Sequence, residues 1–373
     1  MRISITILLF FLNIQLIYSQ NEKNICVEIK TLNSIPYIEV YDKISNKNYE
    51  KIRLKRNSMD DSLDFNTMKL TKIEFLNFNN LSFSKIDLSS NDIDSFPISL
   101  FSIKSLQSLD LVNNEFTEIP EGIASLEKLK SIEFGHTPLK KLPDDFTKLT
   151  NLKKLSINYH SIEDKILFFN MLAQLPNLQD LELWSVGIED TLPEIFLQLK
   201  NVQRLFLLGS DFNFKYVYQY KELRDLEITL SILDSIGSDI KNLTNLERLK
   251  VVGSQNILGM PNEISCLKNL NTLIFDYGLG YTHHTIETKE LYKTILSCVN
   301  LKNLLLGKYF EEFFPFWEHP NLEIFKFYGN SKVPPKADLK KIKKNIYIDI
   351  DYKCYEMNQI NPKIICKDFF DFY

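Results

Sequence analysis

The chain has 373 residues, a formal net charge of −4 and a pI near 5.9. Acidic and basic residues are nearly balanced, so the basic excess of a nucleic-acid-binding surface is missing and we expect no nucleic-acid partner. Length alone would suggest two domains.

Residues 1–19 have the layout of a secretory signal peptide. Arg2 is followed by the apolar run ITILLFFLNIQLIY and then by the small residue Ser19. The run contains Asn13 and Gln15, and it is too short and too polar for a membrane span. We therefore expect cleavage near Ser19 and a secreted or periplasmic protein without stable membrane insertion.

Residues 20–82 show short apolar alternations that predict strands. We expect them to form an irregular, β-rich N-terminal cap that closes the open end of the core formed by the rest of the chain. Residues 49–57 also fit the repeat frame described next, which leaves an earlier start of the repeats open. The alternations lie at residues 25–29, 37–41, 52–54 and 73–75.

Residues 106–126, LQSLDLVNNEFTEIPEGIASL, contain a frame that recurs on both sides. In each unit the positions three and five residues after the first apolar residue are also apolar, as at Leu109 and Leu111. This alternation is strand-like, with one side facing a core and the other facing outward. The units begin at Phe83, Leu106, Leu129, Leu152, Leu178, Val202, Leu223, Leu246, Leu270, Leu301 and Leu322.

The frame and its period, most often 23 residues, resemble the leucine-rich repeat family over residues 83–330, with about 11 units. The resemblance is to exported, bacterial-type members. It implies an α/β repeat solenoid, a right-handed superhelix with a parallel β-sheet on the concave face and short 3₁₀ or α segments on the convex face. A short strand cannot bury its apolar row alone, but stacked strands form one continuous core without a second domain.

The ninth position of the unit is asparagine in the family, where it is expected to bond backbone groups of adjacent coils. Polar side chains that can do this persist through most of the column. The column runs Asn91, Asn114, Thr137, His160, Val186, Ser210, Ser231, Ser254, Gly278, Tyr309 and Asn330.

Three units depart from the frame. Residues 164–175 have helical spacing in place of the proline turn, and residues 211–223 are rich in aromatic side chains. The longest unit predicts a projecting loop at residues 278–285 followed by a helix. After the last unit, residues 346–350 predict a final strand.

Residues 331–373 are expected to form a C-terminal cap with an irregular tail. Cys354 and Cys366 lie close together within it, and either a disulfide that staples the cap or two free thiols fits the sequence. Cys266 and Cys298 lie among apolar residues of the return segments, where we expect small buried thiols.

Local signatures of catalysis are missing from the sequence. It contains no GxSxG elbow, P-loop, HExxH motif or CxxC pair. His283 and His284 form the only histidine cluster, and an ordinary exposed loop explains them better than a metal site. We therefore expect a protein that is not an enzyme and that has no cofactor or metal.

The outward residue at the centre of each predicted strand changes in character along the stack. Four of the first five are acidic, whereas later ones become basic and apolar. A solvated face is expected to be charged, so the change along the stack says more about function than the acidic run does. The column runs Asp87, Asp110, Glu133, Ser156, Glu182, Phe206, Glu227, Lys250, Ile274, Leu305 and Lys326.

Trp184, Phe206 and Leu208 fall on outward positions of two successive predicted strands, about 5 to 10 Å apart. A contiguous exposed apolar patch is unusual without a partner, and an aromatic centre with a charged border is typical of an interaction hot spot. The alternative is that the aromatic segment 212–220 folds back over this patch. The other members of the predicted partner-binding patch are Asn158, Tyr159, Asp180, Glu182 and Arg204.

Three functions fit this sequence. The leading hypothesis is a monomeric, non-catalytic module that binds a protein or peptide on the concave face of the sheet. The second is a carbohydrate or envelope-glycan binder that uses the aromatic side chains of the same face, Trp184 above all. The third is an enzyme whose residues are dispersed over the coils.

Overall fold

The computed structural model divides into two compact units, which are described separately. The first unit holds residues 1–184 and 198–201, and the second holds residues 185–197 and 202–373. The structure describes residues 24–32, 35–42, 47–53, 62–76, 83–186, 192–209, 214–229, 236–253, 260–276, 288–306, 316–327, 340, 346–349 and 358–367.

The first unit begins with a small sheet whose strand order is β3-β2-β1-β5. β1 pairs antiparallel with β2 and parallel with β5. The strands that the alternating apolar residues predict in this part of the chain are therefore present. Their bounds are β1 (Asn24–Leu32), β2 (Ile35–Asp42), β3 (Lys47–Arg53) and β5 (Lys72–Leu76).

The parallel sheet of the first unit begins earlier than the expected start at residue 83. β4 (Ser62–Asp64) pairs in parallel with β6 (Lys85–Asp87), and Leu63 lies opposite Ile86. This coil does not match the frame in the sequence because Asp60 stands where the frame has its first apolar residue. Residues 49–53, part of the stretch that also fits the frame, belong to β3 of the small sheet.

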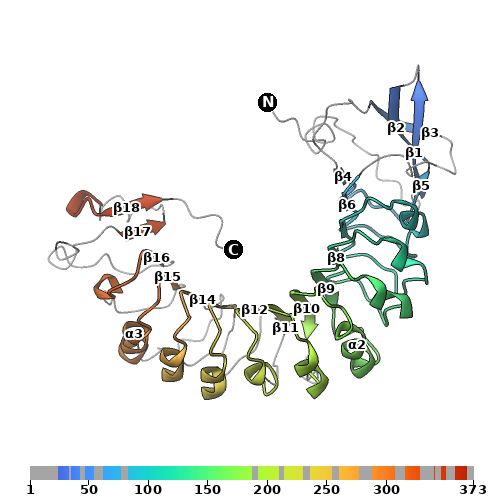
Figure 1. Ribbon diagram of the computed structural model, residues 1–373. Helices are drawn as coiled ribbons and strands as arrows, with labels where there is room; N and C mark the ends of the chain where they lie inside the picture. Colours follow the sequence, from blue (N-terminus) through green and yellow to red (C-terminus); the bar gives the residue numbers. More distant parts are fainter. Residues whose placement is uncertain are drawn as a thin grey trace. The chain divides into compact units, whose positions relative to one another are not determined.

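The remaining coils of the first unit repeat one pattern, a strand followed by a short return helix. In Figure 1 the strands lie on the concave side of this unit and the return helices on the opposite side. Inward residues such as Leu109, Ile132 and Leu155 are fully buried between the two layers. The strands are β7 (Ser108–Asp110), β8 (Ser131–Glu133), β9 (Lys154–Asn158) and β10 (Asp180–Val186), and the return helices are η2 (Ile98–Ser102), η3 (Ile123–Ser125), η4 (Asp144–Lys148) and α2 (Lys165–Leu172).

The second unit has the same two-layer arrangement (Figure 1). Its strands are β11 (Arg204–Gly209), β12 (Asp225–Thr229), β13 (Arg248–Val252), β14 (Thr272–Asp276), β15 (Asn303–Leu306), β16 (Ile324–Phe327), β17 (Ile346–Asp349) and β18 (Ile364–Lys367). The helices of its return path are η6 (Val217–Gln219), η7 (Ser238–Asn242), η8 (Asn262–Cys266), α3 (Thr288–Ser297) and η9 (Phe316–Glu318), while η5 (Glu194–Gln198) precedes β11 in the chain.

Both helices predicted in the irregular units are present, as α2 and α3, because each segment has helical apolar spacing and no proline. The predicted final strand is also present, as β17. The expectation of an irregular tail after it is wrong in part. β18 pairs in parallel with β17, so the tail contributes one more strand to the sheet.

The predicted internal asparagine column is confirmed in the first unit. The buried amide of Asn114 accepts from the N–H of Ile93 at 3.2 Å and donates to the carbonyls of Leu88 and Leu111 at 3.0 Å. Asn91 and Thr137 bond neighbouring coils in the same way. His160 departs from the column because its side chain is exposed.

A second asparagine ladder holds the coils together and was not predicted. In seven coils an asparagine stands one residue before the first apolar position of the frame and donates to a backbone carbonyl of the preceding coil, at 2.6 to 2.9 Å. The recurring dipeptide of asparagine and leucine or valine was its signal in the sequence. The donors are Asn151, Asn177, Asn201, Asn245, Asn269, Asn300 and Asn321.

Candidate functional site on the outward face of the sheet

Four carboxylates stand side by side on the outward face of the first unit. Asp64 lies opposite Asp87, Asp87 opposite Asp110, and Asp110 opposite Glu133, on four adjacent parallel strands. Because neighbouring strands are about 4.8 Å apart, the row is about 14 Å long. All four side chains are partly exposed. We call these four residues the acidic row.

The three aspartates of the acidic row are held by their own strands. One oxygen of each, Oδ1, accepts from the backbone N–H two residues later, at 2.9 to 3.0 Å. Among the described residues, no hydrogen bond engages the second oxygen, Oδ2, of Asp64, Asp87 or Asp110. This oxygen is therefore available to a ligand.

The pKa of Asp110 is raised from 3.8 to about 6. Burial is the largest cause, and the carboxylates of Asp87 and Glu133 raise the pKa further. The backbone hydrogen bond from Val112 and the charge of Lys154 oppose this rise without cancelling it. The negative charge of ionised Asp110, near the centre of the row, therefore destabilises the folded state.

Lys154 neutralises only one end of the row. Its Nζ lies 2.8 Å from Oε2 of Glu133 and 2.9 Å from Oε1 of Glu182. Burial alone would lower the pKa of Lys154, but the bonds from these two carboxylates raise it overall. Lys85 is exposed on the same face, yet in the described part of the chain neither it nor any other base forms an ion pair with the three aspartates.

Two polar side chains of β9 lie between these charged strands. Ser156 is directly opposite Glu133 on one side and Glu182 on the other. Its side chain is 0% exposed, and its Oγ has no hydrogen-bond partner among the described residues. The buried Oδ1 of Asn158 also lacks one in this part of the structure. Unsatisfied buried oxygens are uncommon in folded proteins.

An aromatic pair lies beside the row. The rings of His136 and Trp184 meet edge to face, with centroids 4.8 Å apart and an angle of 78° between the planes. Trp184 Nε1 donates to Oε2 of Glu182 at 3.4 Å. Trp184 is partly exposed, as predicted, and His136 is exposed. His136 was not predicted because a neighbour two strands away brings it into the site.

Two predicted members of the patch are not on the surface. Tyr159 is 0% exposed and packs against Phe168 and Phe169 of α2, with ring centroids 6.3 and 6.0 Å away. The helix that replaces the proline turn supplies this aromatic pocket, so the tyrosine turns inward. Asp180, expected at the rim, is 8% exposed, because the first position of β10 lies within the sheet opposite Lys154.

The predicted patch is divided between the two units. The first unit brings Asn158, Glu182 and Trp184 together at matched positions of β9 and β10. Arg204, Phe206 and Leu208 line the outward side of β11 in the second unit, where they lie opposite residues of β12. Arg204 is exposed, and Phe206 and Leu208 are partly exposed.

The aromatic segment that was a candidate cover for the patch packs elsewhere in its described part. Tyr220 contacts Phe196 of the return path, with ring centroids 5.0 Å apart. The hydroxyl of Tyr218 accepts from the N–H of Gly237 at 3.2 Å. Phe214 stacks on Tyr218, and both are buried, as is Tyr220, whereas Tyr216 is partly exposed. The buried side chains form core of the convex side.

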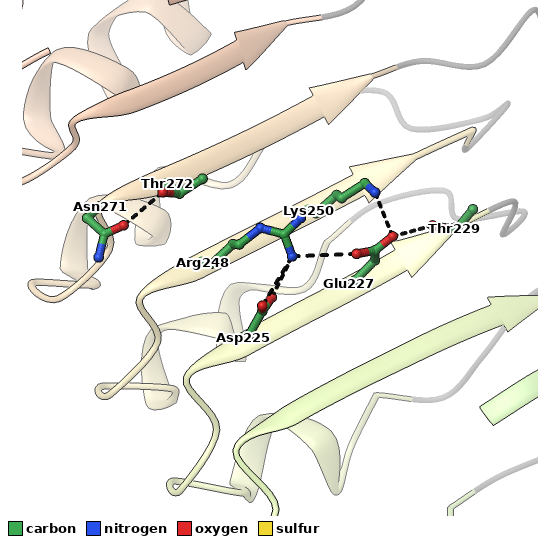
Figure 2. Close-up of polar contacts among 7 residues, drawn as sticks. All are labelled: Asp225, Glu227, Thr229, Arg248, Lys250, Asn271 and Thr272. Carbon is green, nitrogen blue, oxygen red and sulfur yellow. Dashed lines mark hydrogen bonds and ion pairs between the residues drawn. The ribbon is translucent and has the colours of Figure 1, made fainter. Parts of the chain in front are cut away.

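The outward face of the second unit carries a charge-compensated network (Figure 2). Arg248 Nη1 lies 2.9 Å from Oδ1 of Asp225 and 3.5 Å from Oε2 of Glu227, while Lys250 Nζ lies 2.7 Å from Oε1 of Glu227. Burial raises the pKa of Asp225 and outweighs the opposing effect of Arg248. Two acids and two bases thus neutralise one another.

The apolar outward positions of β14 and β15 are not an exposed surface. Ile274 is 1% exposed and Leu305 is 4% exposed, although both lie on the outward side of their strands. Lys250, opposite Ile274, is also buried, at 6%. The change from acidic to basic and apolar residues that the sequence shows is therefore not a change in exposed surface at these three positions.

The cysteine expectations have mixed outcomes. Cys298 is buried, as expected, and burial raises its pKa to about 12. Cys266 is exposed, so the expectation of a buried thiol there is wrong; it occupies a solvent-facing position of η8. Cys354 lies outside the described residues, so the predicted disulfide with Cys366 stays a prediction. Residues 1–19, His283 and His284 also lie outside the described residues, so the expectations about them stay predictions too.

The stacked coils, the parallel strands and the buried asparagine column agree with the repeat frame. A family model described as a leucine-rich repeat region matches residues 63–216. Residues 63–216 are therefore leucine-rich repeats.

Solved structures similar to this protein include an internalin of Listeria monocytogenes, with 18% identity, a TM-score of 0.44, and coverage of 75% of this chain and 90% of that one. A leucine-rich repeat protein of Leptospira interrogans has 21% identity, a TM-score of 0.47, and coverage of 79% and 97%. The Drosophila Toll–Spätzle complex has 18% identity, a TM-score of 0.46, and coverage of 79% and 44%. None of the curated proteins is significantly similar in sequence.

The described residues contain no group of three or more histidine, cysteine, aspartate or glutamate side chains placed to hold a metal ion. None of the helices in the same residues has the length and apolar character to cross a membrane.

Proposed function

We propose that this protein is a non-catalytic binding module and that the outward face of its first unit binds a protein or peptide ligand. One observation carries the proposal: the His136–Trp184 pair adjoins a row of carboxylates of which only the last has an ion-pair partner among the described residues. The matching face of the second unit neutralises its own charges.

The physical reasons favour a macromolecular ligand. Tryptophan with a polar border is the composition of an interaction hot spot, since a large ring gains much from burial while the border excludes water. Contacts with His136 and Glu182 already hold the Trp184 ring, so little side-chain freedom is lost on binding.

The test is an affinity capture with the purified chain. The bait is compared with Trp184→Ala and with a matched control, Ile98→Ala, which removes an exposed apolar side chain (65% exposed) from the return path. We expect a protein or peptide that the unaltered chain and the control retain and that Trp184→Ala loses. Equal retention by all three would contradict the proposal, provided that circular dichroism shows the variants folded.

A glycan ligand is the second candidate, since a partly exposed tryptophan next to carboxylates also suits sugar rings and hydroxyl groups. The uncompensated charge of the acidic row favours a cationic ligand over a neutral sugar. A glycan array separates the two: binding that requires Trp184 would establish the glycan alternative, and an empty array together with a captured protein would establish the first proposal.

We also propose that the protein acts outside the cytoplasm, on the sequence of residues 1–19. N-terminal sequencing of the protein recovered from its native source should give a first residue near Gln20. Recovery of a chain that keeps these residues would contradict export by cleavage.

A further inference from the structure

The acidic row defines the chemistry of a partner. We propose that Asp64, Asp87, Asp110 and Glu133 bind a basic peptide segment in extended conformation, whose lysine or arginine side chains on alternate residues meet the carboxylates. This inference rests on the proposed binding function of the same face and specifies its ligand.

The dimensions of the row suit such a segment. Four carboxylates at successive strand positions span about 14 Å. Alternate side chains of an extended peptide are about 6.7 Å apart, so three of them span about 13 Å on one side of the segment. Lysine and arginine side chains are long and flexible enough to absorb the small mismatch in spacing.

The fold itself does not require these charges. Like charges directly opposite one another on neighbouring strands are destabilising. The second unit avoids this cost by pairing Asp225 and Glu227 with Arg248 and Lys250 (Figure 2). In the first unit the described residues supply no such cation for the three aspartates. A cationic partner would remove the repulsion.

Lys154 shows how an ammonium group binds to this face. Its Nζ contacts Glu133 and Glu182, which lie on β8 and β10, from the strand between them. The buried hydroxyl of Ser156, which has no partner among the described residues, lies in the same line of side chains between those two glutamates. This end of the row is thus already built around a cation.

A metal ion is a poorer candidate than a peptide. The described residues hold no cluster of three acidic, histidine or cysteine side chains with metal-binding geometry. Carboxylates one strand apart instead suit several separate cations carried on one chain. The raised pKa of Asp110 adds a measurable consequence, because a bound cation would lower it and release protons near pH 6.

The experiment uses a fluorescent eight-residue peptide of alternating lysine and threonine, with the purified full chain, at pH 7 and 0.15 M salt. Fluorescence anisotropy measures its affinity for three proteins: the unaltered chain, Asp87→Asn/Asp110→Asn, and Glu118→Gln/Glu127→Gln. The last two change the net charge equally, but Glu118 and Glu127 are exposed on the return path outside the acidic row. Asparagine keeps the Oδ1 acceptor, so the strand contacts of the aspartates are preserved.

We expect the unaltered chain and the return-path variant to bind the peptide equally, and the row variant to bind about tenfold more weakly. Equal affinities of the two variants would overturn the proposal, since binding would then follow net charge alone. A second peptide, with four lysines followed by four threonines, tests the extended register. It should bind severalfold more weakly than the alternating peptide, and equal binding would contradict the register.

Capture of the same partner by the two variants distinguishes failure of this inference from failure of the proposed function. Loss of that partner in Trp184→Ala and in Asp87→Asn/Asp110→Asn supports both. Loss in Trp184→Ala alone overturns the acidic-row inference and leaves the binding function standing. Retention by both variants overturns the binding function itself.

Discussion

Asp87 on β6 and Asp110 on β7 lie directly opposite each other, as paired residues of two parallel strands. Burial and the neighbouring carboxylates raise the pKa of Asp110 to about 6. The positive charge of Lys154, on β9, opposes this rise. Because the pKa of Asp110 is raised, this residue makes the first unit less stable as the pH rises. A salt-bridged aspartate, whose pKa is lowered, has the opposite effect.

Asp110→Asn should remove this pH dependence. The folded pKa is above the unfolded one, so Asp110 costs no stability below pH 3.8, and the cost grows as the pH rises through about 6. The rise in pKa corresponds to about 3 kcal/mol, which solvent screening at this partly exposed group reduces to about 1 kcal/mol. Urea unfolding at pH 7 and pH 4.5 should show the unaltered chain gaining about two thirds of that amount, relative to the variant, at the lower pH. A constant difference between the two proteins would contradict the assignment.

The two asparagine ladders should differ in energetic weight. Asn114→Ala leaves buried backbone groups of two coils without partners and should cost about 2 to 3 kcal/mol. Asn151→Ala removes one exposed hydrogen bond to the carbonyl of Glu127 and should cost about 0.5 to 1 kcal/mol. Chemical denaturation of both variants measures the two values, and equal costs would show that burial does not distinguish the ladders.

Leu155→Asp tests the inward register of the strands. Leu155 is fully buried on β9, so an aspartate there would place an unpaired charge in the core and cost several kcal/mol. Lys153→Asp serves as the control, because that exposed residue lies just before the strand. Thermal unfolding should shift strongly downward for the first variant and little for the second. An unchanged transition for Leu155→Asp would mean that the register is wrong.

Gly209→Ala tests the close approach of two coils in the second unit. Gly209 has φ near +157°, and a Cβ built there would lie 2.1 Å from the carbonyl oxygen of Val186. Backbone must move to admit even one methyl group, so we expect a loss of about 2 kcal/mol or more. Leu208→Ala, at a partly exposed neighbouring position, should cost less. Hydrogen exchange of the amides near residue 209 would locate the effect, and alanine tolerated without loss would exclude the close contact.

Local periodicity was sufficient to predict the repeat, the inward residues of the strands and both irregular helices. The alternation at Leu109 and Leu111 and the helical spacing of residues 165–172 are properties of short stretches, and secondary structure follows them directly. The acidic row could be predicted in part for the same reason, since Asp87, Asp110 and Glu133 occupy one position of the frame.

Only the tertiary structure decided which outward residues are accessible and which charges are neutralised. On a stacked sheet, the neighbours of a side chain come from coils about 23 residues away, and their sizes and directions set its exposure. Tyr159 turns inward because α2 supplies a pocket for its ring, and His136 joins Trp184 across an intervening strand. Lys154 serves Glu133 and Glu182 rather than the aspartates because its strand lies between those two. Such contacts depend on distances between coils, which the order of residues within one repeat does not contain.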